Sequence, residues 1–325
     1  MSAGIVVMVE QRQGAVADIS FEILGAGRKI GDALHAPVYA VVLGRETAAA
    51  AARLGAADAV LAVENAALEV PSPDGAASIL KLLAEQKQAA LVLLGGTNGA
   101  VGIGPRLAAA AKLPFVNFCK GMRAEDGALV LTSQLFGGKI LADVRLPDGR
   151  GVVSVSSGAF PADAGRSDRT PAVEQVDVPV PASKVLFRKF LVPEASDVDI
   201  TKQDVLVAVG RGIQTQDNIT LAEELAQTLG GAVCASRPVI DQGWLSSTRQ
   251  VGKSGMTVKP KLYLALGISG APEHQEGMKD SPLIIAVNTD PKAPIFDIAH
   301  YGTTVDLFEL VPVLKDVVEQ RKAKA

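Results

Sequence analysis

Short apolar runs alternate with Ala- and Leu-rich amphipathic stretches along this chain, and the alternation restarts in the last third of its 325 residues. The first half contains four apolar runs of strand length, at residues 5–9, 38–43, 59–63 and 91–94. The stretches that alternate with them predict helices near residues 21–33, 46–54, 75–86 and 105–111. Strands that alternate with helices are typical of βαβ units around a parallel sheet. The sequence therefore predicts an α/β fold.

The pattern changes from residue 115 onward. Three apolar runs, at residues 129–134, 139–146 and 152–156, follow one another without a helix between them. Gly137-Gly138 separates the first two runs and Asp148-Gly149 the last two. Consecutive strands joined by short turns favour antiparallel pairing. We expect these strands to form an antiparallel extension that closes the N-terminal domain.

Two polar segments follow this extension. Residues 158–181 are rich in Pro, Asp, Ser and Gly, and residues 193–204 are polar and acidic. The α/β alternation restarts at residue 205, so we place the domain boundary at the second segment. We expect an N-terminal α/β domain at residues 1–192, a hinge at 193–204 and a second α/β domain at 205–325, with motion of the domains about the hinge.

The second domain again alternates strands with helices. Its strands are expected at residues 205–209, 233–235, 262–266 and 284–287, and its longer helices at 220–229 and 308–321. This order predicts a Rossmann-like, doubly wound parallel sheet.

The charge and composition exclude several classes of protein. The chain has 32 Lys and Arg against 35 Asp and Glu and no stretch rich in basic residues. It therefore lacks the excess of positive charge that a nucleic-acid-binding surface requires. The longest uncharged stretch, residues 88–105, carries five glycines and a proline, so we expect no membrane insertion. Cys119 and Cys234 form no CxxC motif, and the basic start of a signal peptide is missing. These features favour a reducing, cytoplasmic location and give no metal site.

Two glycine patches imitate nucleotide-binding motifs. Gly25-Ala26-Gly27, with Gly31, lacks the final spacing of a dinucleotide fingerprint and continues as a helical pattern, so it indicates close helix packing. Gly252-Lys253-Ser254 copies the end of a phosphate-binding P-loop, but Ser247 stands where the first glycine belongs and no strand precedes it. Neither patch supports a nucleotide site of its type.

A third glycine patch follows a strand directly. Gly210-Arg211-Gly212 comes after the apolar run 205–209, at the edge where parallel sheets bind ligands. Similar small-residue turns are Ser236-Arg237, residues 250–255 and residues 267–271. Together they would supply N–H groups and hydroxyls to a long, phosphate-bearing ligand. The alternative is a set of unrelated turns.

The same residues offer a second enzymatic interpretation. Residues 267–271 resemble a nucleophile elbow around Ser269, and His274 or His300 with Asp297 could complete a triad. The short spacings argue against it, because triad partners come from separate loops. A serine hydrolase is therefore a weak alternative.

The later residues of this domain resemble a known family. Residues 262–274 (LYLALGISGAPEH), 277–281 (GMKDS) and 286–290 (AVNTD) closely resemble the signature of the electron transfer flavoprotein alpha subunit. The similarity covers the chain from residue 205 to its end. The first 190 residues are similar to the family only in general layout.

The resemblance implies one FAD in the C-terminal domain, at an interface completed by a beta subunit that also contacts the N-terminal domain. The diphosphate and adenosine half of the FAD would be held by Arg211, Ser269, Gly270, Asn288, Asp306 and Leu307. The isoalloxazine would meet Ser236, Arg237, Gln250, Val251, Gly252, Lys253, Ser254, Ala271, Pro272, Glu273 and His274. In the family pattern Arg237 lies beside the flavin, Ser254 bonds its N5 and His274 faces its O2 carbonyl. These three residues are the expected catalytic contacts of the flavin.

The chain departs from the family pattern at two charged positions. Glu273 precedes His274 where the family commonly has Gln, and Pro272 precedes Glu273. Lys253-Ser254 stands where Gln-Thr is usual. A carboxylate and an ammonium near a flavin would change its reduction potential, and the carboxylate would attract a proton to His274.

The resemblance implies an electron-carrying subunit rather than a substrate-transforming enzyme. It would move electrons between acyl-CoA dehydrogenases, as in fatty acid beta-oxidation, and a downstream redox acceptor. One alternative is the alpha subunit of an NADH-dependent electron-bifurcating complex, whose second flavin belongs to the beta subunit. Another is a non-redox, nucleotide-binding regulatory protein.

Overall fold

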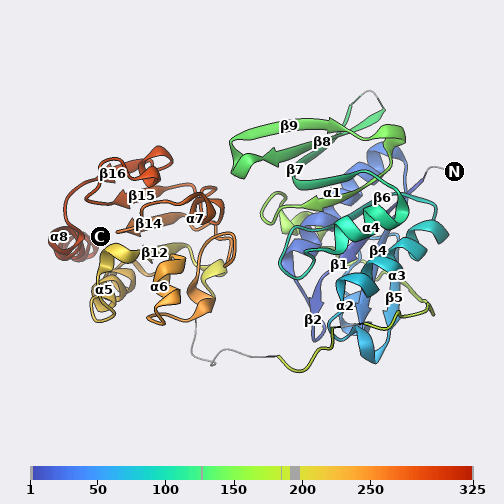
Figure 1. The fold of residues 1–325 in the computed structure, drawn as a ribbon, viewed down its shortest axis with the longest axis horizontal. Helices are drawn as coiled ribbons and strands as arrows, with labels where there is room; N and C mark the ends of the chain where they lie inside the picture. Colours follow the sequence, from blue (N-terminus) through green and yellow to red (C-terminus); the bar gives the residue numbers. More distant parts are fainter. Residues whose placement is uncertain (1–2, 126, 184, 191–197, 324–325) are drawn as a thin grey trace. The chain divides into compact units, whose positions relative to one another are not determined.

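The computed structural model of the chain describes residues 3–125, 127–183, 185–190 and 198–323. The chain divides into two compact units, residues 1–189 and 190–325. Each unit contains a sheet with helices packed on it, as Figure 1 shows, and this confirms the predicted α/β class. Among the residues described, no helix combines the length and the apolar character that crossing a membrane requires.

The first unit is built on a nine-stranded sheet in the order β11-β5-β4-β1-β6-β10-β7-β8-β9. The strands are β1 (Gly4–Val9), β4 (Val38–Gly44), β5 (Ala59–Glu64), β6 (Ala89–Gly95), β7 (Phe115–Glu125), β8 (Ala128–Leu135), β9 (Ile140–Arg145), β10 (Gly151–Val155) and β11 (Ala172–Gln175). The short β2 (Gln11–Arg12) and β3 (Ala15–Val16) form a separate antiparallel pair. The strands from β11 to β7 are parallel, and they include all four strands predicted in the first half.

Helices cover both faces of this parallel region. Alternate side chains of β1 enter opposite cores, since successive residues of a strand point to opposite faces. Ile5 and Val7 lie in the core under α1 (Asp18–Leu34) and α2 (Ala48–Ala51). Val6 lies in the core under α3 (Pro73–Gln86) and α4 (Ile103–Ala111). Burial on both faces explains why these strands read as continuous apolar runs.

The antiparallel extension consists of β7, β8 and β9. Strand β8 pairs antiparallel with β7 on one side and with β9 on the other. The prediction that residues 152–156 belong to the extension is wrong, because β10 lies between β6 and β7 and runs parallel to both. All five residues of β10 are buried, as its interior position requires.

Three further elements of the first unit differ from the prediction. The helix predicted at 46–54 shortens to α2, because the N–H groups of Arg53 and Leu54 donate to carbonyls three residues back instead of four. Strand β11 was missed inside the polar segment because all four of its side chains are exposed. Gly25 lies within α1 against the backbone of Ala164, which confirms close helix packing in place of a fingerprint.

The second unit is built on a five-stranded parallel sheet in the order β13-β12-β14-β15-β16. Its strands are β12 (Val205–Val209), β13 (Ala232–Ala235), β14 (Leu262–Leu266), β15 (Ile284–Val287) and β16 (Tyr301–Thr303). Its helices are α5 (Ile219–Leu229), α6 (Arg237–Asp241), α7 (Pro272–Glu276) and α8 (Leu307–Lys322). The chain passes from β12 to one side for β13 and then to the other side for β14. This reversal of direction is the point at which doubly wound sheets bind ligands.

The four predicted strands and two predicted helices of this unit are present. Strand β16 and helices α6 and α7 were not predicted, because three to five residues are too few to show a period. Val207 packs in the core with α5 and α8, while its neighbour Leu206 packs in the core on the other face. The sheet is therefore covered on both faces.

The predicted hinge, residues 193–204, is described only from residue 198, and residues 193–197 lie outside the described part of the chain. Ile200–Lys202 forms a short 3-10 helix. Ile200 is buried in the core of the second unit. This end of the segment is thus part of the second unit.

Candidate functional site

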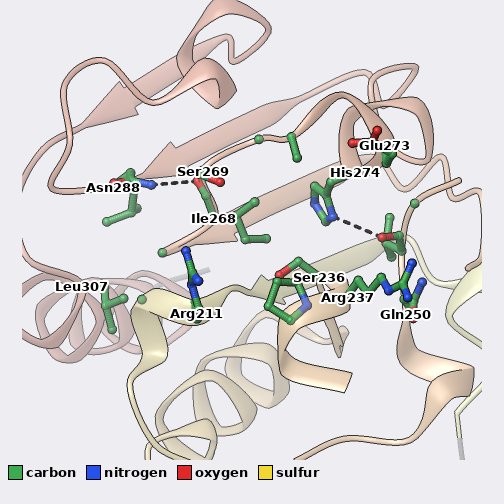
Figure 2. Close-up of a pocket in the computed structure, with 18 of the residues that line it drawn as sticks. Arg211, Ser236, Arg237, Gln250, Ile268, Ser269, Glu273, His274, Asn288 and Leu307 are labelled. Carbon is green, nitrogen blue, oxygen red and sulfur yellow. Dashed lines mark hydrogen bonds between the residues drawn. The ribbon is translucent and has the colours of Figure 1, made fainter. Parts of the chain in front are cut away.

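A cavity of about 830 Å³ opens at the carboxyl edge of the five-stranded sheet. Its walls come from the segments that follow all five strands, together with the loop 250–254. Figure 2 shows the side chains around it, with Arg211, Ser269 and Asn288 on one side and Arg237, Gln250 and His274 on the other. The cavity is of the size that ligand pockets usually have, and it lies at the topological reversal of the sheet.

Glycines let the turns after β12 and β14 touch. The N–H of Gly210 donates to Leu266, and the N–H of Gly212 donates to the carbonyl of Gly267 at 3.1 Å. A Cβ on Gly212 would lie 2.6 Å from the Cα of Gly267, and Gly267 itself has φ +63°. Side chains at these positions would separate the two turns. The Gly-x-Gly sequence therefore shapes the floor of the cavity.

Two backbone N–H groups in the turn after β14 are available to a ligand. Within the described part of the chain, the N–H groups of Ser269 and Gly270 have no protein acceptor, and both residues line the cavity. The carbonyl of Ser269 accepts from Ile295, and Asn288 Nδ2 donates to the carbonyl of Ile268, so this turn is held from behind. Fixed, unpaired N–H groups in a glycine turn form an anion site.

Helix α8 begins at the same edge of the sheet. Asp306 accepts from the N–H of Phe308 at 2.9 Å and is the N-cap of this 16-residue helix. The N-terminus of a helix carries partial positive charge, and Asp306 and Leu307 both line the cavity. This end of the cavity thus suits a phosphate-bearing group.

The glycine loop, residues 250–255, packs on α7 at the opposite end of the cavity. The N–H of Lys253 donates to the carbonyl of Glu273 at 2.7 Å, and Gly252 has φ +139°. A Cβ on Gly252 would lie 2.8 Å from the same carbonyl oxygen. Gln250 Nε2 donates to Ser254 Oγ at 2.9 Å, which leaves the hydroxyl proton of Ser254 to donate elsewhere.

His274 lies on α7, buried at the wall of the cavity. Its Nε2 lies 3.0 Å from the hydroxyl of Tyr263, and its Nδ1 lies 3.2 Å from the carbonyl oxygen of Val251. Burial lowers the pKa of His274 to about 4, against a smaller upward effect of the bond to Val251. The expectation that Glu273 attracts a proton to His274 is therefore not met in this structure, because Glu273 is exposed and burial dominates.

Two cationic side chains of the cavity, Arg237 and Lys253, form ion pairs. Arg237 Nε lies 3.3 Å from Asp241 Oδ2, and this carboxylate partly neutralises the positive charge of the guanidinium. Lys253 Nζ lies 3.8 Å from Glu276, one helical turn beyond Glu273. Both pairs have exposed members and are partly screened by water.

The other interpretations of these residues lack their geometry. The nitrogens of His274 lie at hydrogen-bond distance from Tyr263 and Val251, and Nδ1 of His300 accepts from the N–H of Ile284. Within the described part of the chain, neither imidazole forms a hydrogen bond with Ser269. Among the described residues, no group of three His, Cys, Asp or Glu side chains could hold a metal ion.

All the expected site residues except Pro272 line this one cavity. The lining residues outside the expected site residues and turns are Gln214, Pro238, Asp241, Val287, Thr289 and Val305. Most of them adjoin an expected residue just after a strand, and that position was their only signal. Gln214 lines the cavity with φ +68°, a conformation with no sequence marker in a glutamine.

Two protein-family descriptions match this chain. The family described as electron transfer flavoprotein FAD-binding domain matches residues 199–279, and the electron transfer flavoprotein domain matches residues 5–181. The chain is 36% identical over 322 residues to the electron transfer flavoprotein subunit alpha of Thermoanaerobacterium thermosaccharolyticum, covering 97% of this chain and 98% of the relative.

Two further relatives carry other names. The acryloyl-CoA reductase electron transfer subunit beta of Anaerotignum propionicum is 35% identical over 350 residues, covering 97% of this chain and 95% of the relative. The lactate dehydrogenase (NAD(+),ferredoxin) subunit LctC of Acetobacterium woodii is 32% identical over 324 residues, covering 97% of this chain and 77% of the relative. The chain belongs to the electron transfer flavoprotein alpha-subunit family and contains its FAD-binding domain.

Proposed function

We propose that this chain is the FAD-carrying subunit of a heterodimeric electron transfer flavoprotein, which moves electrons between an acyl-CoA dehydrogenase and a downstream redox acceptor in the cytoplasm. The observation that supports it most is the cavity, whose two ends have different chemistry. One end offers unpaired N–H groups and a helix N-terminus, and the other offers a glycine loop, a hydroxyl and paired charges.

The first end suits the diphosphate and adenosine half of FAD. The N–H groups of Ser269 and Gly270 would bind phosphate oxygens, and the guanidinium of Arg211 would add charge. Both polar atoms of the Asn288 amide already form hydrogen bonds: Nδ2 donates to the carbonyl of Ile268, and Oδ1 accepts from the N–H of Asp290. The role of Asn288 would therefore be to hold the turn at residues 268–270 in place, rather than to bind the ligand with its own side chain.

The second end suits the isoalloxazine ring, which accepts and releases the electrons when FAD is bound. Ser254 has a hydroxyl proton to donate toward a ring nitrogen, since its oxygen accepts from Gln250. Arg237 places a cation at the same end, where it would stabilise negative charge. Ser236, Val251, Gly252 and Ala271 would shape the surroundings of the ring.

An alternative function is a subunit that exchanges electrons with NADH and a second acceptor. The name of one relative, of which this chain covers 77%, includes NAD(+) and ferredoxin, and it favours this alternative. The two functions differ in the nucleotide that the beta subunit holds. An ordinary carrier would hold one FAD and one AMP per heterodimer, and a bifurcating complex would hold two FAD.

Co-expression with the beta subunit tests both functions. The purified complex should be yellow, and its FAD and AMP contents, determined after denaturation, separate the two alternatives. A colourless complex that still contains a bound nucleotide would contradict both and favour a regulatory nucleotide-binding protein.

A further inference from the structure

A buried tyrosine lies behind His274 and is not among the cavity-lining residues. Tyr263, on β14, is fully buried, and its hydroxyl oxygen lies 3.0 Å from His274 Nε2. The two rings are 6.0 Å apart between centroids, with an angle of 56° between their planes. Val251, on the glycine loop, contacts the other ring nitrogen: its carbonyl oxygen lies 3.2 Å from His274 Nδ1.

The chemistry of these atoms fixes the proton positions. A backbone carbonyl can only accept, so the proton of a neutral imidazole must be on Nδ1 if both contacts are hydrogen bonds. Nε2 is then an acceptor, and the hydroxyl of Tyr263 must donate to it. Cys234 Sγ, 4.0 Å from the same hydroxyl oxygen, is a weak donor that can occupy a lone pair of the phenol.

We propose that Tyr263 is a positioning residue that holds His274 as the neutral Nδ1–H tautomer, with both ring nitrogens turned to protein groups rather than to the ligand. The imidazole then offers the flavin no N–H donor, in contrast to the contact with the O2 carbonyl that the family resemblance implies. The proton positions rest on the protein's own contacts. Their consequence for the flavin rests on the proposed function.

Burial outweighs the charged groups around His274. On its own helix lie Glu273 and Glu276, and on the glycine loop lies Lys253, whose recorded ion pair is with Glu276. Arg249 donates to the carbonyl of Val233, and Arg237 pairs with Asp241. The main influence on the imidazole is burial, which favours its neutral form.

A purely structural role for Tyr263 makes different predictions. A tyrosine that only fills the core would affect stability when its hydroxyl is removed, but would leave the protonation of His274 unchanged. The two roles are therefore separated by the imidazole nitrogens themselves and not by activity.

The direct test is ¹⁵N NMR of the FAD-loaded αβ complex, with labelled histidines in this chain only and His274→Gln for assignment. We expect Nδ1 of His274 to be protonated and Nε2 to be an unprotonated, hydrogen-bonded acceptor from pH 8 down to about pH 5.5. An Nε2 that carries a proton over this range would overturn the proposal. This measurement needs no substitution at Tyr263.

The second test compares Tyr263→Phe with Tyr301→Phe. Tyr301 lies on β16 and is 68% exposed, so it serves as the control. In Tyr263→Phe the Nε2 signal should shift, and the titration midpoint of His274 should rise by about one pH unit because the neutral form loses its donor. Tyr301→Phe should change neither. If both variants left the His274 signals of the parent unchanged, Tyr263 would have a structural role alone. A complex without FAD would contradict the proposed function, while the same NMR spectra would still decide the role of Tyr263.

Discussion

Arg237 lines the cavity at the end where we propose that the isoalloxazine ring binds, and its Nε lies 3.3 Å from Asp241. We expect Arg237→Ala to lower the reduction potential, because it removes positive charge near a ring that becomes negative. With a side chain 67% exposed, the effect should stay below about 59 mV, the equivalent of a tenfold change in a one-electron equilibrium.

The matched control for Arg237→Ala is Asp241→Asn, which removes the partner and should raise the potential. Potentiometric titrations of the two complexes would measure both. If the curves of both variants superimposed on that of the parent, the pair would be electrostatically silent at the flavin.

Glu273 and Lys253 are the two charges that depart from the family pattern. We expect Glu273→Gln to raise the potential at pH 7 and Lys253→Gln to lower it, since a carboxylate opposes added negative charge and an ammonium favours it. Both side chains are exposed, so each shift should be smaller at high salt. A Glu273→Gln potential unchanged at low salt would show that this carboxylate has no electrostatic role.

The buried imidazole of His274 should make stability depend on pH. Its pKa is lowered to about 4 in the folded chain, whereas an unfolded histidine titrates near 6.5. The stability that this group contributes is therefore complete above about pH 6.5 and is lost as the pH falls toward 4, by about 3 kcal/mol. Denaturant unfolding of the chain, followed by the fluorescence of its one tryptophan, Trp244, measures this loss.

The control variants for this pH dependence are His274→Gln and His35→Gln, the latter at an exposed helix end. The first should flatten the stability profile between pH 6.5 and 4, and the second should not. A parent profile that was already flat in this range would mean that His274 titrates normally.

The residues of the site differ in how readily sequence predicts them. Ser269, Gly270 and Arg211 follow strands directly, and the topology alone brings such positions to one edge. Tyr263 gave no such signal, because inside an apolar strand it looks like any core residue. Its bond to His274 depends on the side-by-side packing of β14 and α7, which a linear pattern does not contain.

At the scale of elements, the strands buried on both faces were predicted well, whereas β7, β11 and β16 were not. Strands β1, β4, β12 and β14 are buried on both faces, so their sequences are continuous apolar runs. Strand β7 has an irregular burial pattern and β11 is fully exposed, so neither produces a period. The position of β10 between β6 and β7 depends on non-local pairing, which explains why it was assigned to the wrong part of the sheet.

The contact between the turns after β12 and β14 gives a prediction at this scale. Gly210→Ala should destabilise the second unit by about 1–3 kcal/mol and weaken FAD binding, because a Cβ there would overlap the carbonyl of Gly267. Gly230→Ala is the control, since Gly230 has φ +73° but open space around it. Thermal unfolding should show a loss of stability in both variants, because alanine at the positive φ of Gly230 is itself strained, but only Gly210→Ala should weaken FAD binding in a titration. Equal FAD affinity in both variants would argue against a role of the turn contact in binding.

At the scale of the whole molecule, the proposed function requires FAD, the beta subunit and this chain to form a single assembly. A ligand that binds only the assembled state stabilises it by mass action. We therefore expect the isolated chain to bind FAD more weakly than the αβ complex does. Gel filtration of the chain alone with FAD measures this, and an isolated chain that stays saturated with FAD would show that the beta subunit is not needed to complete the site.

In the proposed function, the FAD of this chain exchanges electrons with an acyl-CoA dehydrogenase. The most direct measurement is the visible spectrum of the αβ complex under anaerobic conditions, with the acyl-CoA dehydrogenase of the same cell present in catalytic amount and its acyl-CoA added. We expect the acyl-CoA to bleach the absorbance of the bound FAD only when the dehydrogenase is present. A bound FAD that remained oxidised under these conditions, although dithionite reduces it, would show that this dehydrogenase is not its electron donor.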